Sequence, residues 1–451
     1  MAMAAMSTNR MPDKASDDSE ASLLSGKPTS GITLAMLPLR KGGASPMPAM
    51  ANLVKSLLGA GILSVANAFA KSGLVWGIIL YLLVGVGVTG GNLALIAAKH
   101  ELNKRGRLDV ETFSEVGGAV FGPWGSFIVS AQVVFLELAF CAGFVVVILD
   151  QLHVEVGLPT ALGWRALASI GLAVPLALLA NIRWLKDLWL VSVFGLLVYV
   201  VGIVGLSVYE SGVELSQGTQ PPDVTPTASG LVLFVGVAVY ANEGINLVLP
   251  VETTLSDRSN GYWVTAVGML SYNTMCAAMG ALAFSAGLGE CGLITDCFTN
   301  ATAAAVVRWA LVIALLASHP LQLYPASEIL ERGMGLQGGS PAPADAVVPE
   351  GEDPPESWPT FWKRVSLRCF LALVTCLLGS LVPDFPLLAD IIGNLVMTLV
   401  GFVLPVALYT ALFWRTMPWY AWVLGALSVV FGLVTCVFGT IASVEHLIAN
   451  I

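Results

Sequence analysis

The sequence predicts an all-α polytopic membrane protein with eleven transmembrane helices. Of its 451 residues, 56% are hydrophobic and only 11% are charged, whereas about 25% are charged in an ordinary soluble domain. The mean hydropathy is +0.80. Apolar stretches long enough to cross about 30 Å of hydrocarbon, which takes roughly 20 helical residues, recur along the chain. The net charge of -9 also argues against a nucleic-acid partner.

The chain begins with a polar segment that precedes the predicted helices. Residues 1–46 are rich in Ser, Lys and Asp and lack the pattern of a cleavable signal peptide, so we expect a disordered cytosolic tail. Eight helices are predicted in 47–332 and three in 361–451. The linker 333–360 is rich in Gly, Pro and acidic residues and is expected to be disordered and cytosolic. The helices are predicted to begin near Met50, Leu74, Pro123, Trp164, Asp187, Ser229, Tyr262, Ala304, Ser366, Pro386 and Pro418.

The positions of the basic residues indicate the topology, because Lys and Arg near helix ends are retained on the cytoplasmic side. With the N-terminus in the cytosol, 17 of the 21 Lys and Arg residues fall in predicted cytosolic segments. Only Lys71, Arg165 and Arg308 fall on the opposite side, and Lys55 lies within the first helix. An odd number of helices then places the C-terminus outside the cell or in a lumen.

The loop after the seventh predicted helix falls on this outer side. It carries Cys291 and Cys297, which are candidates for a disulfide, although two unpaired thiols are an open alternative. Asn300 begins an Asn-Ala-Thr acceptor sequence for glycosylation close to the next helix. The other five cysteines fall in apolar helices, where we expect packing roles.

Two helices contain glycine and polar residues in mid-span, which indicates a helix break that faces a cavity. The first contains NLVKSLLGAG (residues 52–61), and the sixth contains YANEGIN (residues 240–246). These helices open two consecutive sets of five. Interrupted helices at matching positions of two halves are typical of transporters built from inverted repeats, with the binding site at the midplane. Glycines that only allow close helix contacts are the alternative.

A broken helix exposes amide groups at one side of the break and carbonyl groups at the other, so the pair suits a zwitterion. We expect the amides to hold a carboxylate and the carbonyls to hold an ammonium group. The amides belong to Gly59, Ala60 and Gly61, and the carbonyls lie near Tyr240, Ala241 and Asn242.

Four stretches in the same order resemble the amino acid/auxin permease family. Residues 52–63, followed by Lys71-Ser72-Gly73, resemble its first helix. Glu243-Gly244 with Leu249-Pro250-Val251-Glu252 is similar to the sixth helix, especially in the proton-coupled amino acid transporter branch. Residues 320–329 resemble the end of the eighth helix, and residues 368–405 resemble the ninth and tenth. The resemblance covers residues 47–443. It implies a LeuT-type fold of five plus five inverted helices with an eleventh appended, and secondary active transport of amino acids.

The sequence departs from the family pattern at two places near the expected site. Ala66-Asn67 stands where the family often has proline after the first break, and Phe144 stands where many members have tyrosine. These departures leave the identity of the substrate open.

Lys55 is the most informative charge, because an ammonium group in mid-membrane costs at least about 2.5 to 3.5 kcal/mol and must face a partner or water. Sodium-coupled relatives look to have asparagine at the matching position, together with a hydroxyl residue that corresponds to Ser318 here. The resemblance therefore implies that the Lys55 ammonium replaces a sodium ion. A lysine that snorkels or forms a structural ion pair is the alternative.

Two carboxylates are candidates for proton coupling. Glu243 lies in the break of the sixth helix and is the leading candidate, with a purely structural role as the alternative. Glu137 lies within the third helix, where it either pairs with Lys55 or faces another helix.

The remaining patterns argue against an enzyme. The chain has no GxxxxGK[ST] loop for ATP, no nucleophile elbow and no zinc-ligand spacing, so no cofactor or metal is expected. We therefore expect a sodium-independent, proton-coupled permease for small neutral amino acids that works by alternating access. Its partners are the amino acid, protons and the lipid bilayer. An amino acid sensor with little flux, or a permease for another carboxylate such as an auxin-like acid, remains the alternative.

The membrane is specified only weakly. Residues 17–24 resemble an acidic dileucine sorting signal whose spacing is off by one. The plasma membrane and a vacuolar or endosomal membrane both remain open.

Overall fold

The computed structural model describes residues 44–107, 110–159, 161–181, 194–336 and 358–450. Within these ranges, ten helices are long and apolar enough to cross a membrane, and there are eleven if the bent pair at the start counts as one span. The predicted class of an all-α polytopic membrane protein is confirmed. The predicted tail (residues 1–46) and the predicted linker (residues 333–360) lie largely outside the described residues. The first described helix begins at Pro46, and the linker is described only at its two ends.

The first to fifth spans contain the following helices: α2 (Pro46–Leu57), η2 (Ala60–Ser64), α3 (Val65–Ser72), α4 (Leu74–Lys104), α5 (Phe113–Val156), α6 (Leu162–Ala180), η4 (Val198–Gly205) and α8 (Leu206–Ser216). The sixth to eighth spans contain α9 (Ala228–Asn242), α10 (Ile245–Thr254), η5 (Arg258–Asn260), α11 (Gly261–Ser285) and α12 (Ala301–Gly333), with η6 (Ile294–Asp296) in the loop before α12. The last three contain α13 (Trp358–Leu381), α14 (Phe385–Ile392), η7 (Gly393–Met397), η8 (Leu399–Val403), α15 (Leu404–Phe413), α16 (Trp419–Val434), η9 (Thr435–Gly439) and α17 (Thr440–Asn450).

Two helices begin earlier than the sequence predicts. Helix α5 begins at Phe113, because Thr112 and Glu115 form a capping box that starts the helix before the apolar stretch. The predicted start at Pro123 marks a kink instead, where Gly122 has a φ of 70°. Helix α13 begins at Trp358 with a polar and aromatic turn that precedes its apolar part. Apolar length therefore located these membrane spans but missed their extensions.

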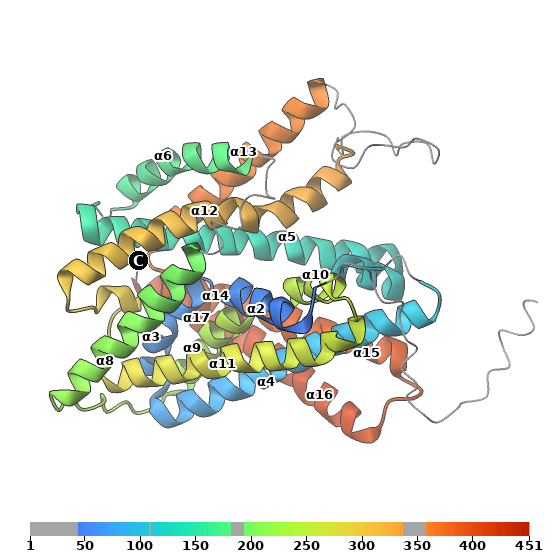
Figure 1. Ribbon diagram of the computed structural model, residues 1–451, viewed down its shortest axis with the longest axis horizontal. Coiled ribbons are helices and arrows are strands. Elements are labelled where there is room, and N and C mark those ends of the chain that lie inside the picture. The colour runs from blue at the N-terminus through green and yellow to red at the C-terminus, as the bar shows by residue number, and fades with distance from the viewer. Residues whose placement is uncertain (1–43, 108–109, 160, 182–193, 337–357, 451) are drawn as a thin grey trace, which may run out of the picture. The chain divides into compact units, whose positions relative to one another are not determined.

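The spans pack in two groups (Figure 1). The scaffold consists of α5, α6, α12 and α13, which contact one another. The bundle consists of the first, second, sixth and seventh spans, in which α3 and α4 contact α9 and α11. The tenth span lies against the bundle through contacts of α14 with α9 and of α15 with α4, and the eleventh packs on the tenth.

At one helix crossing, two glycines allow the backbones of two spans to touch. A Cβ atom added at Gly393 in η7 would overlap the carbonyl oxygen of Gly236 in α9. A Cβ added at Gly236 would lie 2.8 Å from the carbonyl oxygen of Asp390. Small residues allow membrane helices to approach this closely. The tenth span is thereby set directly against the broken sixth span.

Candidate functional site

Both predicted helix breaks are present. The first span is interrupted between Leu57 and Ala60 and bends by 55° there. The sixth span is interrupted between Asn242 and Ile245, where Glu243 has extended backbone. These interruptions free backbone groups in the middle of two membrane spans.

The two breaks lie against each other. A Cβ atom at Gly61 would lie 2.8 Å from the Cα of Ala241, so only glycine fits this position without a shift. A Cβ at Gly244 would lie 2.5 Å from Cδ2 of Leu57 at the end of α2. The freed amides of one span and the freed carbonyls of the other are therefore neighbours.

The helices that follow the two breaks, η2 and α10, differ in how their first turns are capped. The backbone N–H of Ile245 donates to Oε1 of Glu243 over 3.0 Å, so α10 starts with a carboxylate at its positive end. At the first break, Gly59 is the N-cap residue of η2, and no described side chain caps this helix. On the carbonyl side, the Tyr272 hydroxyl donates to the Ala241 carbonyl over 2.9 Å. The first break therefore offers the uncapped positive end.

A cavity of about 270 Å³, the central cavity, lies between these breaks. Nine of the ten residues predicted for substrate binding and coupling line it. They are Lys55, Gly59, Ala60, Gly61, Glu137, Tyr240, Ala241, Glu243 and Ser318. Asn242 is outside the lining, because its side-chain amide turns back along α9 and donates to the carbonyl of Ala238 over 2.9 Å.

Lys55 lies in the last turn of α2 and is half-buried at the cavity. Within the described residues, no carboxylate forms an ion pair with its ammonium group. Ser318 of α12 lines the same cavity. Ser56, which follows Lys55 in the sequence and is exposed, also lines it. The cavity thus continues from the helix breaks toward the beginning of the first span.

Glu137 does not pair with Lys55. Its Oε1 accepts a hydrogen bond from the Asn246 side chain over 3.2 Å, and its Oε2 accepts one from the Gln322 side chain over 2.5 Å. Glu137 and Gln322 belong to the scaffold, whereas Asn246 belongs to α10 of the bundle. This buried carboxylate therefore joins the two groups of helices beside the central cavity.

Several lining residues were not predicted from the sequence. Besides several leucines such as Leu315, they include the aromatic residues Phe140 and Tyr199 and the amides Asn246 and Gln322. The ring of Tyr240 packs between Phe140 and Phe385, with centroid distances of 5.1 and 5.6 Å. Tyr199 comes from η4, where it stands as a lone hydroxyl in an aliphatic run, and that was its only signal in the sequence.

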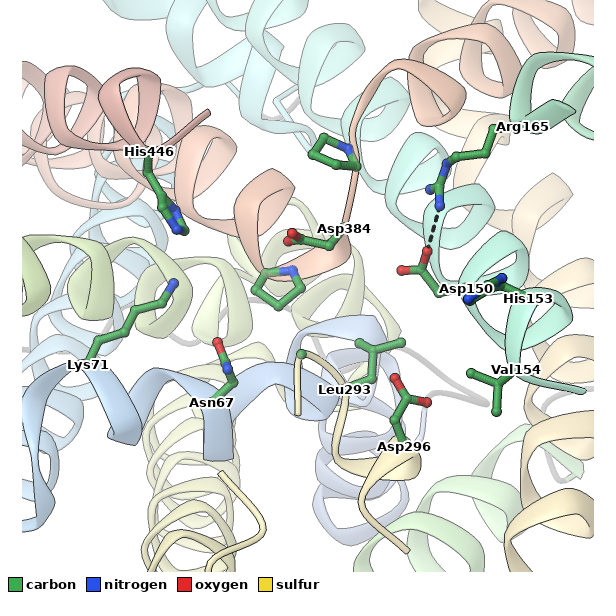
Figure 2. A pocket seen from close by; sticks show the side chains of 13 residues that line it. Asn67, Lys71, Asp150, His153, Val154, Arg165, Leu293, Asp296, Asp384 and His446 are labelled. Atoms are coloured by element: carbon green, nitrogen blue, oxygen red, sulfur yellow. Dashed lines mark hydrogen bonds and ion pairs between the residues drawn. The ribbon is translucent and has the colours of Figure 1, made fainter. Parts of the chain in front are cut away.

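A larger cavity of about 460 Å³, the outer cavity, lies at the end of the spans that carries Lys71 (Figure 2). Lys71 pairs with Asp390 over 2.7 Å and so joins the first span to the tenth. Arg165 pairs with Asp150 over 3.0 Å and joins the fourth span to the third, as the dashed line in Figure 2 shows. Neither helix break lines this cavity, so the central cavity is the better candidate for the substrate.

The third basic residue predicted on the outer side is paired as well. Arg308 of α12 pairs with Glu155 of α5 over 2.8 Å, and its guanidinium also donates to the carbonyl of Thr295. Each of the three cations predicted on this side thus ties two spans, or a span and a loop, at the end that bears the outer cavity.

The loop 286–300 is fastened to the same end. Cys291 and Cys297 are joined by a disulfide. The Asn67 side chain donates to the Gly289 carbonyl over 3.3 Å, and the Gln151 side chain donates to Asp296 over 3.3 Å. The loop therefore contacts both the bundle, through Asn67, and the scaffold, through Gln151.

Asn300, the predicted glycosylation site, begins α12. Its side-chain oxygen accepts a hydrogen bond from the backbone N–H of Ala303 over 3.1 Å. Asn300 and Thr302 are both exposed. The acceptor sequence thus lies on the surface of the first turn of the helix.

A buried charge cluster holds the opposite end of the bundle. Glu252 of α10 accepts a hydrogen bond from Lys99 over 2.5 Å and lies 3.0 Å from Nε2 of His100, both on α4. The side chains of Lys99 and Glu252 are fully buried. Nearby, Ala44 forms a parallel bridge with Leu255, which follows α10. The beginning of the first span and the end of the sixth are therefore fastened together and to the second span.

Most of the chain is similar to known proteins. A family model described as transmembrane amino acid transporter protein matches residues 42–445. Amino acid transporter AVT3C of Arabidopsis thaliana is 28% identical over 426 residues, which cover 90% of this chain and 91% of the plant protein. Vacuolar amino acid transporter 3 of Schizosaccharomyces pombe is 27% identical over 311 residues, which cover 66% of this chain and 45% of the yeast protein.

A solved structure resembles the fold. The crystal structure of MhsT in complex with L-phenylalanine matches with a TM-score of 0.50 at 14% sequence identity, covering 89% of this chain and 99% of MhsT. This likeness concerns the fold, and it confirms the predicted LeuT-type arrangement of spans.

Proposed function

The chain belongs to the transmembrane amino acid transporter family, and from that premise we propose that it carries small neutral amino acids together with protons, independently of sodium, by alternating access. Transport of amino acids across a membrane follows from the family. The finer proposal rests on one observation: two broken spans cross at a cavity that also contains one lysine and two glutamates.

The contact between the two breaks supports a binding site for the carboxylate and ammonium groups of the substrate. The uncapped amides at the start of Ala60–Ser72 attract a carboxylate, and the carbonyls at the end of α9 attract an ammonium group. The carboxylate of Glu243 already occupies the positive end of α10, which directs the substrate carboxylate to the first break. The cavity volume of about 270 Å³ favours a small amino acid.

Lys55 supports independence from sodium. Lys55 lines the cavity that Ser318 also lines, and its ammonium group has no ion-pair partner among the described residues, so it supplies a positive charge at the cavity where a cation would otherwise bind. A Lys55→Asn variant is expected to gain stimulation by sodium, because it removes the ammonium group and leaves its position free for a sodium ion. Lys104→Asn, at an exposed position of α4, is the matched control.

Among the two glutamates, the contacts favour Glu137 as the proton carrier. Glu243 accepts a hydrogen bond at the start of α10, where the helix dipole stabilises its negative charge. Glu137 instead has two amide partners, and the side-chain oxygen of Asn246 has no partner among the described residues. A half-turn of that amide would present its oxygen to a protonated Glu137. Both protonation states can thus be hydrogen-bonded at the contact between bundle and scaffold.

The structure supports a state that is open toward the beginning of the first span. The central cavity reaches the exposed Ser56, whereas at the opposite end the Lys71–Asp390 ion pair joins two spans and the loop 286–300 is hydrogen-bonded to the first span. With the predicted topology, this state faces the cytosol and the disulfide faces a lumen or the exterior. The vacuolar membrane named for the yeast relative is the location we favour.

Uptake into proteoliposomes tests the proposal. Purified protein is reconstituted and supplied with labelled alanine under an inward proton gradient, an inward sodium gradient or neither. We expect stimulation by acid outside and indifference to sodium. Stimulation by sodium would overturn the coupling, and saturable binding without uptake would instead favour a sensor.

Variants of the carboxylates locate the proton. Glu137→Gln is expected to lose uptake driven by the proton gradient but to retain exchange of labelled for unlabelled alanine, because the neutral amide resembles the protonated state. Glu243→Gln should remain sensitive to pH. Glu328→Gln, which removes a surface ion pair on α12, is the control. If Glu137→Gln keeps the wild-type pH dependence, the assignment to Glu137 is wrong.

A further inference from the structure

The break between α9 and α10 is short, and few changes would close it. The two helices count as one membrane span, Ala228–Thr254, and are bent by no more than 40°, whereas the first span is bent by 55°. Only Glu243 and Gly244 separate them. A continuous helix would also pair the backbone groups that the break frees, which is favourable away from water. The fold therefore needs contacts that keep the sixth span broken.

One hydrogen bond of a continuous helix would join Ile245 to Ala241, because each N–H of an α-helix donates to the carbonyl four residues earlier. The described structure has no hydrogen bond between these two groups. Each has a side-chain partner instead. The Ile245 N–H donates to Oε1 of Glu243 over 3.0 Å, and the Ala241 carbonyl accepts from the Tyr272 hydroxyl over 2.9 Å. The donor and the acceptor of one missing helical bond are thus both satisfied by side chains.

The two side chains approach the break from different places. Glu243 lies in the break and lines the central cavity. Tyr272 lies on α11, no residue of which lines that cavity, and it is 1% exposed. Tyr272 therefore acts on the site only through the backbone of the sixth span. Removal of either side chain would leave a buried backbone group without its partner, which is unfavourable.

We propose that Tyr272 and Glu243 are positioning residues that act as a pair and keep the sixth span broken. The consequence for the substrate rests on the proposed function, in which the carbonyls at the end of α9 hold the ammonium group. A closed helix would use those carbonyls for its own N–H groups. Tyr272 thus supports the substrate site from a span that does not line it.

Thermal unfolding of the detergent-solubilised protein tests whether the two residues act as a pair. Tyr272→Phe removes the donor and Glu243→Met removes the acceptor, and each should lower Tm by about 1 to 3 °C because a buried backbone group loses its partner. In the double variant the freed N–H and carbonyl can bond to each other, so Tm should be no lower than in the single variants. Glu243→Gln keeps an acceptor oxygen and should unfold close to the wild type. Tyr209→Phe, at an exposed position of α8, is the control.

Equilibrium binding of labelled alanine to the same proteins should not follow Tm. Each single variant should bind about fivefold more weakly, and the double variant should bind most weakly, by at least about tenfold, because its sixth span can close. The double variant would then combine the weakest binding with a Tm no lower than that of the single variants. Residues that only stabilise the fold would instead lower binding and Tm together.

The outcomes separate this inference from the proposed function. A double variant whose Tm falls by the sum of the two single shifts overturns the inference, as does a double variant that binds alanine no more weakly than the single ones. If the wild type binds no alanine, the proposed function fails, and the comparison of the Tm values still decides whether the pair holds the break.

Discussion

Removal of Lys99 is expected to destabilise the protein through the carboxylate that it leaves behind. In Lys99→Met, Glu252 stays fully buried and retains only His100 as a hydrogen-bond partner. Breaking a buried ion pair from one side costs about 3 to 5 kcal/mol, and the remaining partner argues for about 3 kcal/mol. With an unfolding entropy of about 0.9 kcal/mol/K for a chain of this length, Tm falls by about 3 °C.

The assay is thermal unfolding of the detergent-solubilised protein, followed by intrinsic fluorescence. Lys104→Met, on the exposed last turn of the same helix, is the control and should leave Tm unchanged. Adding Glu252→Gln to Lys99→Met should recover most of the loss, because a neutral amide needs no cation. The reasoning is refuted if Lys99→Met unfolds with the control, or if the double variant loses the sum of the two single effects.

Three further predictions concern the break, the loop and the disulfide. Gly61→Ala should abolish alanine uptake because its Cβ would lie 2.8 Å from the sixth span, whereas Gly59→Ala, whose nearest atom would be 3.9 Å away, should retain it; equal uptake would contradict this. Burial raises the pKa of Asp296 above its ordinary value of 3.8, so the folded state binds this proton more tightly than the unfolded chain. Its stabilising contribution is therefore complete below the unfolded pKa and is lost as the pH rises through the folded one. Thermal unfolding between pH 4 and 8 should show that loss, and Asp296→Asn should reduce it. Maleimide labelling of the denatured chain should add five tags before reduction and seven after it, whereas seven tags without reductant would contradict the disulfide.

The sequence located the breaks but not everything that surrounds them. Gly59 and Gly61 stand out because glycines interrupt an apolar run, and a local pattern of this kind can be seen in one segment. The partners of Glu137 could not be found in the same way, because Asn246 and Gln322 lie far along the chain and meet it only through tertiary packing. Tyr199 carried too little signal, since one tyrosine in an aliphatic span is ordinary.

Charge placement shows the same division. The distribution of Lys and Arg placed Lys71, Arg165 and Arg308 on one side, because that rule depends on position along the chain. It did not identify Asp390, Asp150 or Glu155 as their partners, since each pair joins spans whose contact depends on the packing of the whole fold. Helix ends were predicted less well, because the capping box before α5 lies outside the apolar stretch.

The crossing of α9 and η7 has a consequence for protein engineering. Gly236 and Gly393 have no side chain to alter, yet one added methyl group at Gly393 would meet backbone and separate two membrane spans. A mutational survey that ranks positions by the size of the native side chain would assign these two the lowest weight. In this chain, the two spans can approach closely because these glycines have no Cβ atom. A redesign that preserves every large residue can therefore still lose the fold at these two positions.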